Sequence, residues 1–370
     1  MTSASVTTGS SGPGGSADSG GPAGPTRFEV THTTEYSYPS TVSSSFGELV
    51  IQPRDAPGQR CLRSSLSIEP KPHDLRERVD FFGNRTTYFA VLAPHTRLSV
   101  TAVSRIDVGE RPMEKGPEQP IAWRAARDRI RGAIGTGPDA DEAALEARQY
   151  VLGSPLVSLS GELSGRLADY AATSFRPGAP LLEASVSLSS RIFHDFTYLP
   201  GATEVTSTID EVLEQGAGVC QDFAHLAIGC LRSLGLAARY VSGYLETQPP
   251  PGQERLAGAD ASHAWFSVFV PGTGWVDVDP TNDQLVDHRY ITTAWGRDYT
   301  DVPPVKGVIF TRGDRQDLRV AVDVLRVVDP EPTPDREHSN DPERTPDREP
   351  PVRGLPVSNP AHTDTESEPA

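Results

Sequence analysis

The sequence predicts an α+β protein in which a β-rich N-terminal part precedes a mixed core. Residues 27–108 contain short runs of alternating apolar side chains without helical periodicity. Residues 123–192 place apolar side chains at helical spacing, and residues 216–283 combine one amphipathic helix with several strands. Strand-rich and helix-rich stretches that follow each other along a chain are typical of α+β folds.

The β-rich part, residues 27–110, is expected to form a β-sandwich-like module. Its runs alternate as strands with one buried face do, for example at Phe28 and Val30, and Gly83-Asn84 is a plausible turn. Several short strands separated by turns favour a sandwich. No pattern in this module indicates catalysis, and we expect Cys61 to be a small buried or edge residue.

Residues 111–328 form the predicted core, which begins with four expected helices. Their apolar positions place them over residues 123–134 and 139–152, near residues 163–170, and near residues 181–192. The two ends of the chain are expected to be disordered. Residues 1–26 are rich in Gly and Ser, and residues 329–370 are rich in Pro, with eleven acidic residues against four basic ones.

The composition excludes several classes of protein. The formal net charge of −16 argues against nucleic acid and anionic membranes as partners, and no apolar run is long enough to span a membrane. Three cysteines in 370 residues are too few for a disulfide framework. With no signal-peptide pattern, the expected compartment is the reducing cytoplasm. The oligomeric state stays open.

A helix that starts at Cys220 carries the first sign of chemistry. Its apolar positions recur at i, i+3, i+4, i+7, i+8 and i+11 from Phe223, and Gly235 is a suitable residue to end it. Cys220 lies in the first turn, on the same face as Phe223. The positive end of a helix dipole favours a thiolate, which is the nucleophilic form of cysteine.

A histidine and an aspartate follow on neighbouring predicted strands. Residues 236–245, 263–270 and 275–279 are the expected strands, with His263 at the start of the second and Asp279 at the end of the third. A cysteine, a histidine and a carboxylate are the nucleophile, base and orienting group of thiol acyl-transfer enzymes.

The strand register tests this arrangement. His263 and Asp279 share a face of the sheet only if the numbers of paired residues sum to an even value. A four-residue Pro-Gly-Thr-Gly loop would pair Val270 with Trp275 and place the two side chains on opposite faces. The hypothesis therefore requires a three- or five-residue loop, or a β-bulge.

Some neighbouring residues have alternative interpretations. Asp277 faces the same way as Asp279, and periodicity cannot separate the two. Cys230 lies on the apolar stripe and is expected to pack in the core, while His225 is expected to contact Asp222 locally. A metal site of Cys220, His225 and His263 is conceivable, but no CxxC or HxxxH spacing supports it, so we expect no metal. The thiol chemistry itself requires no cofactor.

Other polar groups are weaker candidates. The backbone N–H of Cys220 is a plausible oxyanion donor, but a second donor cannot be assigned. Gln215, Tyr198 and Gln221 are the weak candidates for it. The segment Arg297-Asp298-Tyr299 either lines a cleft or forms a salt-bridged loop.

Three segments resemble the core of bacterial transglutaminase-like proteins. They are GVCQDFAHLAIGCLRSLGLAARYVSGYL, SHAWFSVFVPGTGWVDVDPTND and GRDYTDVPPVKGV. Residues 27–108, with FGN and PHTRLSV, resemble the β-rich region that often precedes that core. The resemblance covers about residues 27–328 and implies a papain/transglutaminase-like fold, with the cysteine helix packed on an antiparallel sheet. It also implies that GVC supplies the nucleophile Cys220, HAW the base His263 and DPT the orienting Asp279.

The resemblance implies acyl transfer on peptide or glutaminyl amides of a protein or peptide substrate. Hydrolysis is the expected outcome. Transamidation through the same acyl-enzyme is the first alternative, and a non-catalytic peptide-binding module is the second. The intact cysteine, histidine and aspartate argue against the second.

Overall fold

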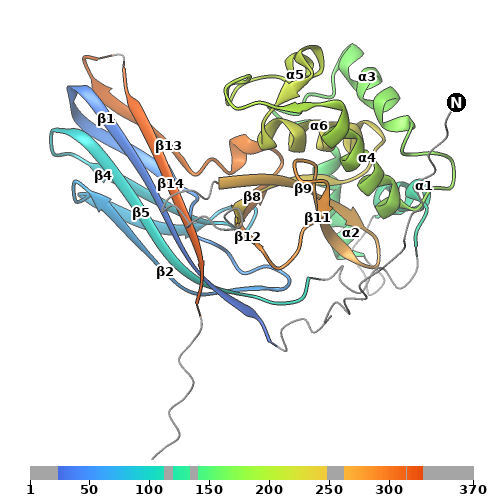
Figure 1. Ribbon diagram of the computed structural model, residues 1–370, viewed down its shortest axis with the longest axis horizontal. Helices are drawn as coiled ribbons and strands as arrows, with labels where there is room; N and C mark the ends of the chain where they lie inside the picture. The colour runs from blue at the N-terminus through green and yellow to red at the C-terminus, as the bar shows by residue number, and fades with distance from the viewer. Residues whose placement is uncertain (1–23, 112–119, 134–140, 248–261, 314, 328–370) are drawn as a thin grey trace, which may run out of the picture. The chain divides into compact units, whose positions relative to one another are not determined.

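A computed structural model describes residues 24–111, 120–133, 141–247, 262–313 and 315–327 (Figure 1). The α+β class is confirmed, with a β-rich N-terminal region followed by helices and a second antiparallel sheet. The sequence predicts disorder over residues 1–26 and 329–370; of these, residues 1–23 and 329–370 lie outside the described residues. None of the described helices is long and apolar enough to cross a membrane.

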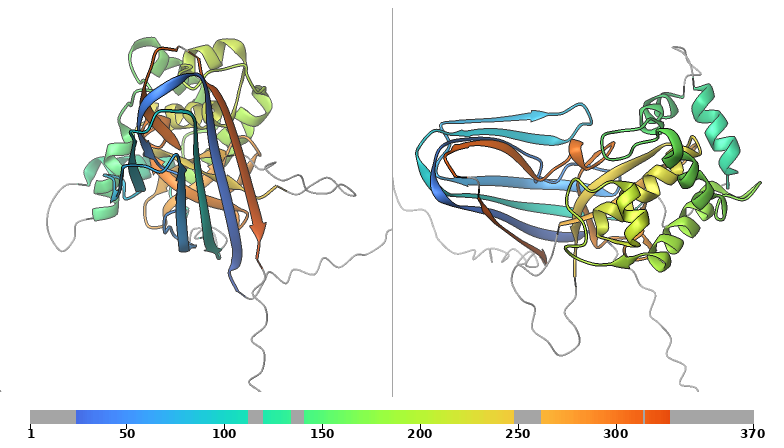
Figure 2. Two further views of the ribbon diagram at one scale, coloured as in Figure 1. Left: turned by 90° about the vertical axis from the view of Figure 1, so that its left-hand side faces the viewer. Right: turned by 90° about the horizontal axis from the view of Figure 1, so that it is seen from above.

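The N-terminal sheet is built around β1 (Thr26–Leu49), which changes partners halfway along its length. Its first half pairs with β5 (His95–Val108) and β14 (Asp317–Arg326), and its second half pairs with β4 (Arg85–Val91) and β13 (Val305–Thr311). The sheet is completed by β2 (Gln59–Glu69) and β3 (Asp74–Val79). Apolar residues of β2, β4 and β5 share one buried cluster. The part of the sheet around β5 therefore packs face to face with the part around β4 (Figure 2).

The last two strands lie in a different part of the fold from the one their sequence position predicts. The core was expected to run through residue 328, but β13 and β14 both pair with β1. Antiparallel partners need no proximity in sequence, so a strand at the end of the chain can complete a sheet that begins it. The N-terminal sheet thus includes residues from both ends of the described chain.

The second sheet is antiparallel, five-stranded and ordered β11-β10-β9-β8-β12. Its strands are β8 (Ala238–Leu245), β9 (Ser262–Val270), β10 (Gly274–Asp279), β11 (Gln284–Leu285) and β12 (Tyr290–Gly296). A separate parallel pair consists of β6 (Thr197–Tyr198) and β7 (Ala217–Gly218).

The helices are α1 (Trp123–Gly132), α2 (Glu142–Ala147), α3 (Gly161–Ala172), α4 (Leu181–Asp195), α5 (Ile209–Gln215) and α6 (Cys220–Ser233), with short 3₁₀ turns at Arg148–Val151 and Tyr299–Asp301.

Helix α6 lies at the centre of the core (Figure 1). The sequence predicts one apolar face, yet every side chain from Gln221 to Arg232 is buried. The sheet covers one side of the helix, and α3, α4 and α5 contact the others. Its polar side chains are buried with partners; the Arg232 guanidinium, for example, donates to the carbonyls of Ala238 and Arg297. Gly235 ends the helix with a φ of +78°, as predicted.

Candidate active site

Cys220 is the first residue of α6 and is partly exposed. The start of the helix is held by Asp222, whose carboxylate accepts from the Val219 N–H at 2.8 Å and from the Thr203 hydroxyl at 2.6 Å. Burial raises the pKa of Asp222 in spite of these two hydrogen bonds. The thiol is therefore held at the positive end of a fully packed helix.

His263 and Asp279 are brought together by the register of β9 and β10. Val270 pairs with Gly274, so the connecting loop has three residues, 271–273, and paired residue numbers sum to an even value. This meets the condition that the sequence sets. The His263 Nε2 and Asp279 Oδ2 atoms lie 2.7 Å apart.

The imidazole of His263 also interacts with the Cys220 side chain. Because Nε2 faces Asp279, the nitrogen left for the sulfur is Nδ1. Burial lowers the pKa of His263, but the hydrogen bonds and charges of Asp279 and Cys220 outweigh it and raise the pKa to about 10. The ring therefore keeps its proton at neutral pH, next to the sulfur.

The face of β9 that carries His263 is not the face that packs on the helices. Ala264, Phe266 and Val268 share a buried cluster with α6, whereas Trp265 belongs to a cluster on the other face. His263 alternates with Ala264 and lies on the Trp265 side. It contacts Cys220 at the start of the strand rather than across the helix–sheet interface.

Asp279 is fully buried and accepts four hydrogen bonds. Besides His263, the donors are the Thr281 N–H at 2.8 Å, the Asn282 side-chain amide at 2.7 Å and the Tyr290 hydroxyl at 2.7 Å. Burial alone raises the pKa of this carboxyl, but these donors and the charge of His263 lower it below its usual value. Asp279 therefore stays ionised although its side chain is fully buried.

Sequence reasoning missed both Asn282 and Tyr290. Asn282 lies three residues after Asp279 in the Asp-Pro-Thr-Asn turn, a spacing at which a side chain can reach back to its neighbour. Tyr290 starts the next long strand, and nothing in the local pattern connects it with Asp279.

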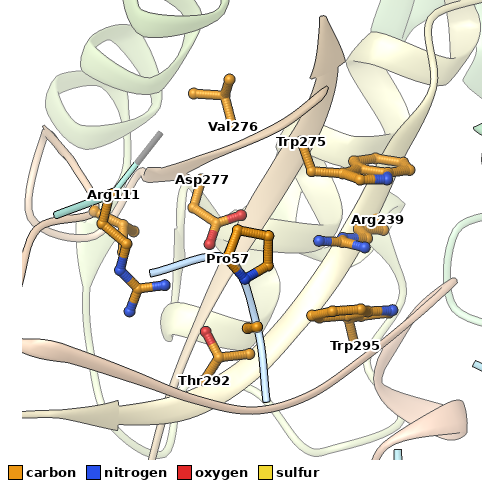
Figure 3. A pocket seen from close by; sticks show the side chains of 10 residues that line it. Pro57, Arg111, Arg239, Trp275, Val276, Asp277, Thr292 and Trp295 are labelled. Carbon is orange, nitrogen blue, oxygen red and sulfur yellow. The ribbon is translucent and has the colours of Figure 1, made fainter. Parts of the chain in front are cut away.

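Asp277 lies on the same face of β10 but lines a separate cavity of about 30 Å³ (Figure 3). The Arg239 guanidinium in this cavity lies between two indole rings, 4.3 Å from the centre of Trp275 and 3.8 Å from that of Trp295. Burial lowers the pKa of Arg239 to about 10, although the charge of Asp277 opposes this. The geometry thus separates the two aspartates, and only Asp279 contacts His263.

Two further expectations have opposite outcomes. The predicted contact between Asp222 and His225 is wrong, because His225 is buried and accepts from the Tyr299 N–H at 3.2 Å. The Asp222 carboxylate instead accepts from the Val219 N–H at the start of α6. Cys230 is fully buried in the core cluster, which confirms its packing role.

Among the residues that the structure describes, no three His, Cys, Asp or Glu side chains form a cluster suited to a metal ion.

The three candidates for a second oxyanion donor lie in different surroundings. Gln215 is exposed at the end of α5, and the Gln221 amide is engaged by the Val205 carbonyl at 2.9 Å. Tyr198 is half-exposed, and burial and the charge of Cys220 raise the pKa of its phenol.

The segment after β12 is a salt-bridged loop. Arg297 pairs with Asp301 at 2.9 Å, and the buried Asp298 carboxylate accepts from the Leu156 N–H at 2.8 Å. These contacts explain the charged residues without a role at the candidate site.

The two α6 cysteines should differ sharply in reactivity. At pH 6.5 we expect iodoacetamide to label Cys220, which is partly exposed beside a protonated imidazole, and to leave the buried Cys230 unlabelled until the protein unfolds. Peptide mapping by mass spectrometry after short exposures measures both. Equal labelling of the two cysteines in the folded protein would contradict the placement of Cys220.

The fold and the site together define an α+β protein in which a cysteine at the start of a core helix meets a histidine–aspartate pair on an antiparallel sheet. Residues 28–107 match the bacterial transglutaminase-like N-terminal region, and residues 169–280 match the transglutaminase-like superfamily. The chain belongs to the transglutaminase-like superfamily, as the resemblance of its motifs implied.

Several known proteins are similar to this chain. An uncharacterised protein of Mycobacterium tuberculosis is 45% identical over 308 residues, which cover 81% of this chain and 92% of that protein. A protein-glutamine gamma-glutamyltransferase of Pseudomonas aeruginosa is 32% identical over 99 residues, 26% of this chain and 15% of that protein. A solved structure from Cytophaga hutchinsonii, described as a candidate cysteine protease, has a TM-score of 0.62 at 20% identity and covers 84% of this chain and 94% of its own. That structure supports the fold alone.

Proposed function

We propose that the chain is a thiol-dependent acyl-transfer enzyme that acts on peptide or glutaminyl amide bonds. One observation carries this proposal: Cys220, at a helix start, interacts with His263, whose Nε2 atom lies 2.7 Å from the buried Asp279. This is the order of contacts that nucleophilic catalysis by a thiolate requires. The nucleophile is Cys220, the acid and base is His263, and the residue that orients the base is Asp279.

The proposed reaction has two halves. The Cys220 thiolate attacks the amide carbonyl carbon, and His263 gives its proton to the departing amine as the C–N bond breaks. His263 then takes a proton from water, which attacks the thioester, and the C–S bond breaks to release an acid and restore the thiolate. The Cys220 N–H, one of the first-turn donors without a partner inside the helix, is the candidate oxyanion donor.

Hydrolysis and transamidation share every step up to release of the first amine. They diverge on whether water or an acceptor amine reaches the thioester, so the cysteine, histidine and aspartate cannot decide between them. We propose hydrolysis, because we can assign no segment of the described chain to an amine-binding pocket. Transamidation is the second candidate, because the Pseudomonas aeruginosa relative is a protein-glutamine gamma-glutamyltransferase.

Product analysis tests the proposal and its alternative together. The protein is incubated with a peptide panel and glutamine-containing proteins, plus excess labelled primary amine, and the products are weighed. Free acids, absent with Cys220→Ala, are the expected result. Labelled amides that depend on Cys220 would establish transamidation instead. A protein whose Cys220 forms no acyl adduct with any substrate, while peptides still bind, would be a peptide-binding module.

The free state of all three cysteines favours the cytoplasm as the proposed compartment.

A further inference from the structure

The outer edge of β12 is paired with side chains of the N-terminal module rather than with another strand. β12 is an edge strand of the core sheet, so its outward backbone groups need partners from elsewhere. The Gln59 amide donates to the Thr292 carbonyl and accepts from the Thr292 N–H, both at 2.7 Å. The Asn84 amide donates to the Trp295 carbonyl at 2.8 Å and accepts from the Trp295 N–H at 3.0 Å. Each amide thus replaces one residue of a neighbouring strand.

The spacing of these two contacts matches an irregularity in β12. In a regular strand, backbone groups that face outward recur at every second residue. The pairing of β12 with β8 shifts between Thr292 and Ala294, so the next outward residue is Trp295. Both amides are buried, with Gln59 6% exposed and Asn84 fully covered. The two-point pairing therefore specifies where β12 lies.

Arg54 joins the two amides into one network. Its carbonyl accepts from the Gln59 amide at 2.8 Å, its guanidinium donates to the Asn84 carbonyl oxygen at 2.6 Å, and its charge lies 3.3 Å from the centre of the Trp295 ring. Ile291 of β12 also packs in a buried apolar cluster with Phe28 and Ile106 of the module. The cavity lined by Pro57, Thr292 and Trp295 borders β12 (Figure 3). Directional hydrogen bonds thus act beside apolar packing in fixing the position of β12.

β12 begins with Tyr290, whose hydroxyl donates to Asp279 at 2.7 Å. The Tyr290 ring also packs against the rings of Trp265 and His263, with centres 5.4 and 6.0 Å away. A shift of β12 along or away from β8 would move this hydroxyl. The Tyr290–Asp279 hydrogen bond therefore connects the module to the His263–Asp279 pair.

We propose that Gln59 and Asn84 of the N-terminal module are positioning residues of the active site, which act through β12 and Tyr290 on the Asp279–His263 pair. The module is thus part of the working enzyme and not an independent binding unit. This inference rests on the proposed function of Cys220, but its test needs no substrate.

The test compares two buried glutamines of the module. Gln59→Leu removes both contacts with β12, whereas Gln52→Leu removes an amide whose partners, Ser64 and Thr87, lie within the module. The readout is the rate of Cys220 alkylation by iodoacetamide from pH 5 to 9. We expect Gln59→Leu to slow labelling at pH 6.5 by roughly tenfold and to shift the pH profile, since small displacements at a reacting centre have effects of this order. Gln52→Leu should leave the labelling rate and its pH profile unchanged.

A double-mutant cycle separates positioning from a general loss of stability. If Gln59 acts through Tyr290, adding Tyr290→Phe to Gln59→Leu should slow labelling little more than the stronger single change does. The inference would be overturned if the two rate reductions multiplied in the double variant. It would also be overturned if Gln59→Leu and Gln52→Leu slowed Cys220 alkylation equally. If Gln59→Leu does not fold, Gln59→Glu, which keeps the acceptor and loses the donor, takes its place.

The failure of this inference can be told apart from failure of the proposed function. Selective labelling of Cys220 in the unmodified protein, with the same pH profile in Gln59→Leu, would overturn the positioning role alone. Absence of selective labelling in the unmodified protein would overturn the proposed function, and the positioning role with it.

Discussion

Replacing Asp279 with asparagine is expected to reduce turnover by roughly three to four orders of magnitude while the protein still folds. The Asp279 Oδ2 atom accepts from Asn282, Tyr290 and the His263 ring. An amide nitrogen at that position cannot accept. It would instead donate to His263 Nε2 and leave the proton on Nδ1, which faces the sulfur. An imidazole in that tautomer cannot take a proton from the thiol or from water.

Flipping the amide restores an acceptor for His263 but not the negative charge that stabilises the protonated imidazole. With the amide oxygen in the Oδ2 position, the NH₂ group would face the Thr281 N–H, which now donates to Oδ1 at 2.8 Å. A buried donor without an acceptor costs about 1–3 kcal/mol, which lowers stability but does not unfold a body of this size. Turnover and alkylation of Cys220 are the measurements, with melting as the check on folding.

Asp277→Asn is the matched control for this experiment. Asp277 lies two residues before Asp279 on the same face of β10, and it lines the cavity beside Arg239 instead of contacting His263. We expect nearly normal turnover. A greater loss of turnover in Asp277→Asn than in Asp279→Asn would mean that the orienting carboxylate is Asp277.

The sequence alone predicts the elements that carry the candidate site. A cysteine before a run of helical apolar spacing, and a histidine and an aspartate on two strands joined by a short loop, are local patterns, and local patterns survive in a single sequence. These patterns and the loop length place Cys220 at a helix start and put His263 on one face with Asp277 and Asp279, whereas only the DPT resemblance selects Asp279.

What the sequence does not predict depends on contacts between distant segments. Tyr290 reaches Asp279 only because β12 pairs with β8, and Gln59 reaches Thr292 across 233 positions of the chain. The complete burial of α6 likewise depends on which helices cover it, and its polar residues His225 and Arg232 give no sign of this in the helical pattern. Pairing partners of edge strands are set by the whole fold rather than by local periodicity.

Gly243→Ala is the substitution with the largest expected effect on stability. Gly243 lies in β8, directly opposite His263 of β9. A Cβ atom there would lie 2.2 Å from the Ile291 carbonyl oxygen and 2.4 Å from a ring atom of the fully buried Trp265. The carbonyl belongs to β12 and the ring packs on Tyr290, so neither can yield without moving the residues around Asp279. We expect a loss of about 3 kcal/mol or more in the free energy of unfolding, because overpacking in a rigid core is costly.

Gly165→Ala makes the same chemical change where the structure leaves room. Gly165 is an exposed residue inside α3, and an added Cβ would have no atom within 4 Å. Because alanine loses less backbone entropy than glycine in a helix, this variant should gain about 0.5–1 kcal/mol. Urea unfolding of both variants beside the parent protein measures the difference, and alkylation of Cys220 shows whether Gly243→Ala also disturbs the site. Stability changes of the same sign in the two variants would contradict the close packing of β8, Trp265 and β12.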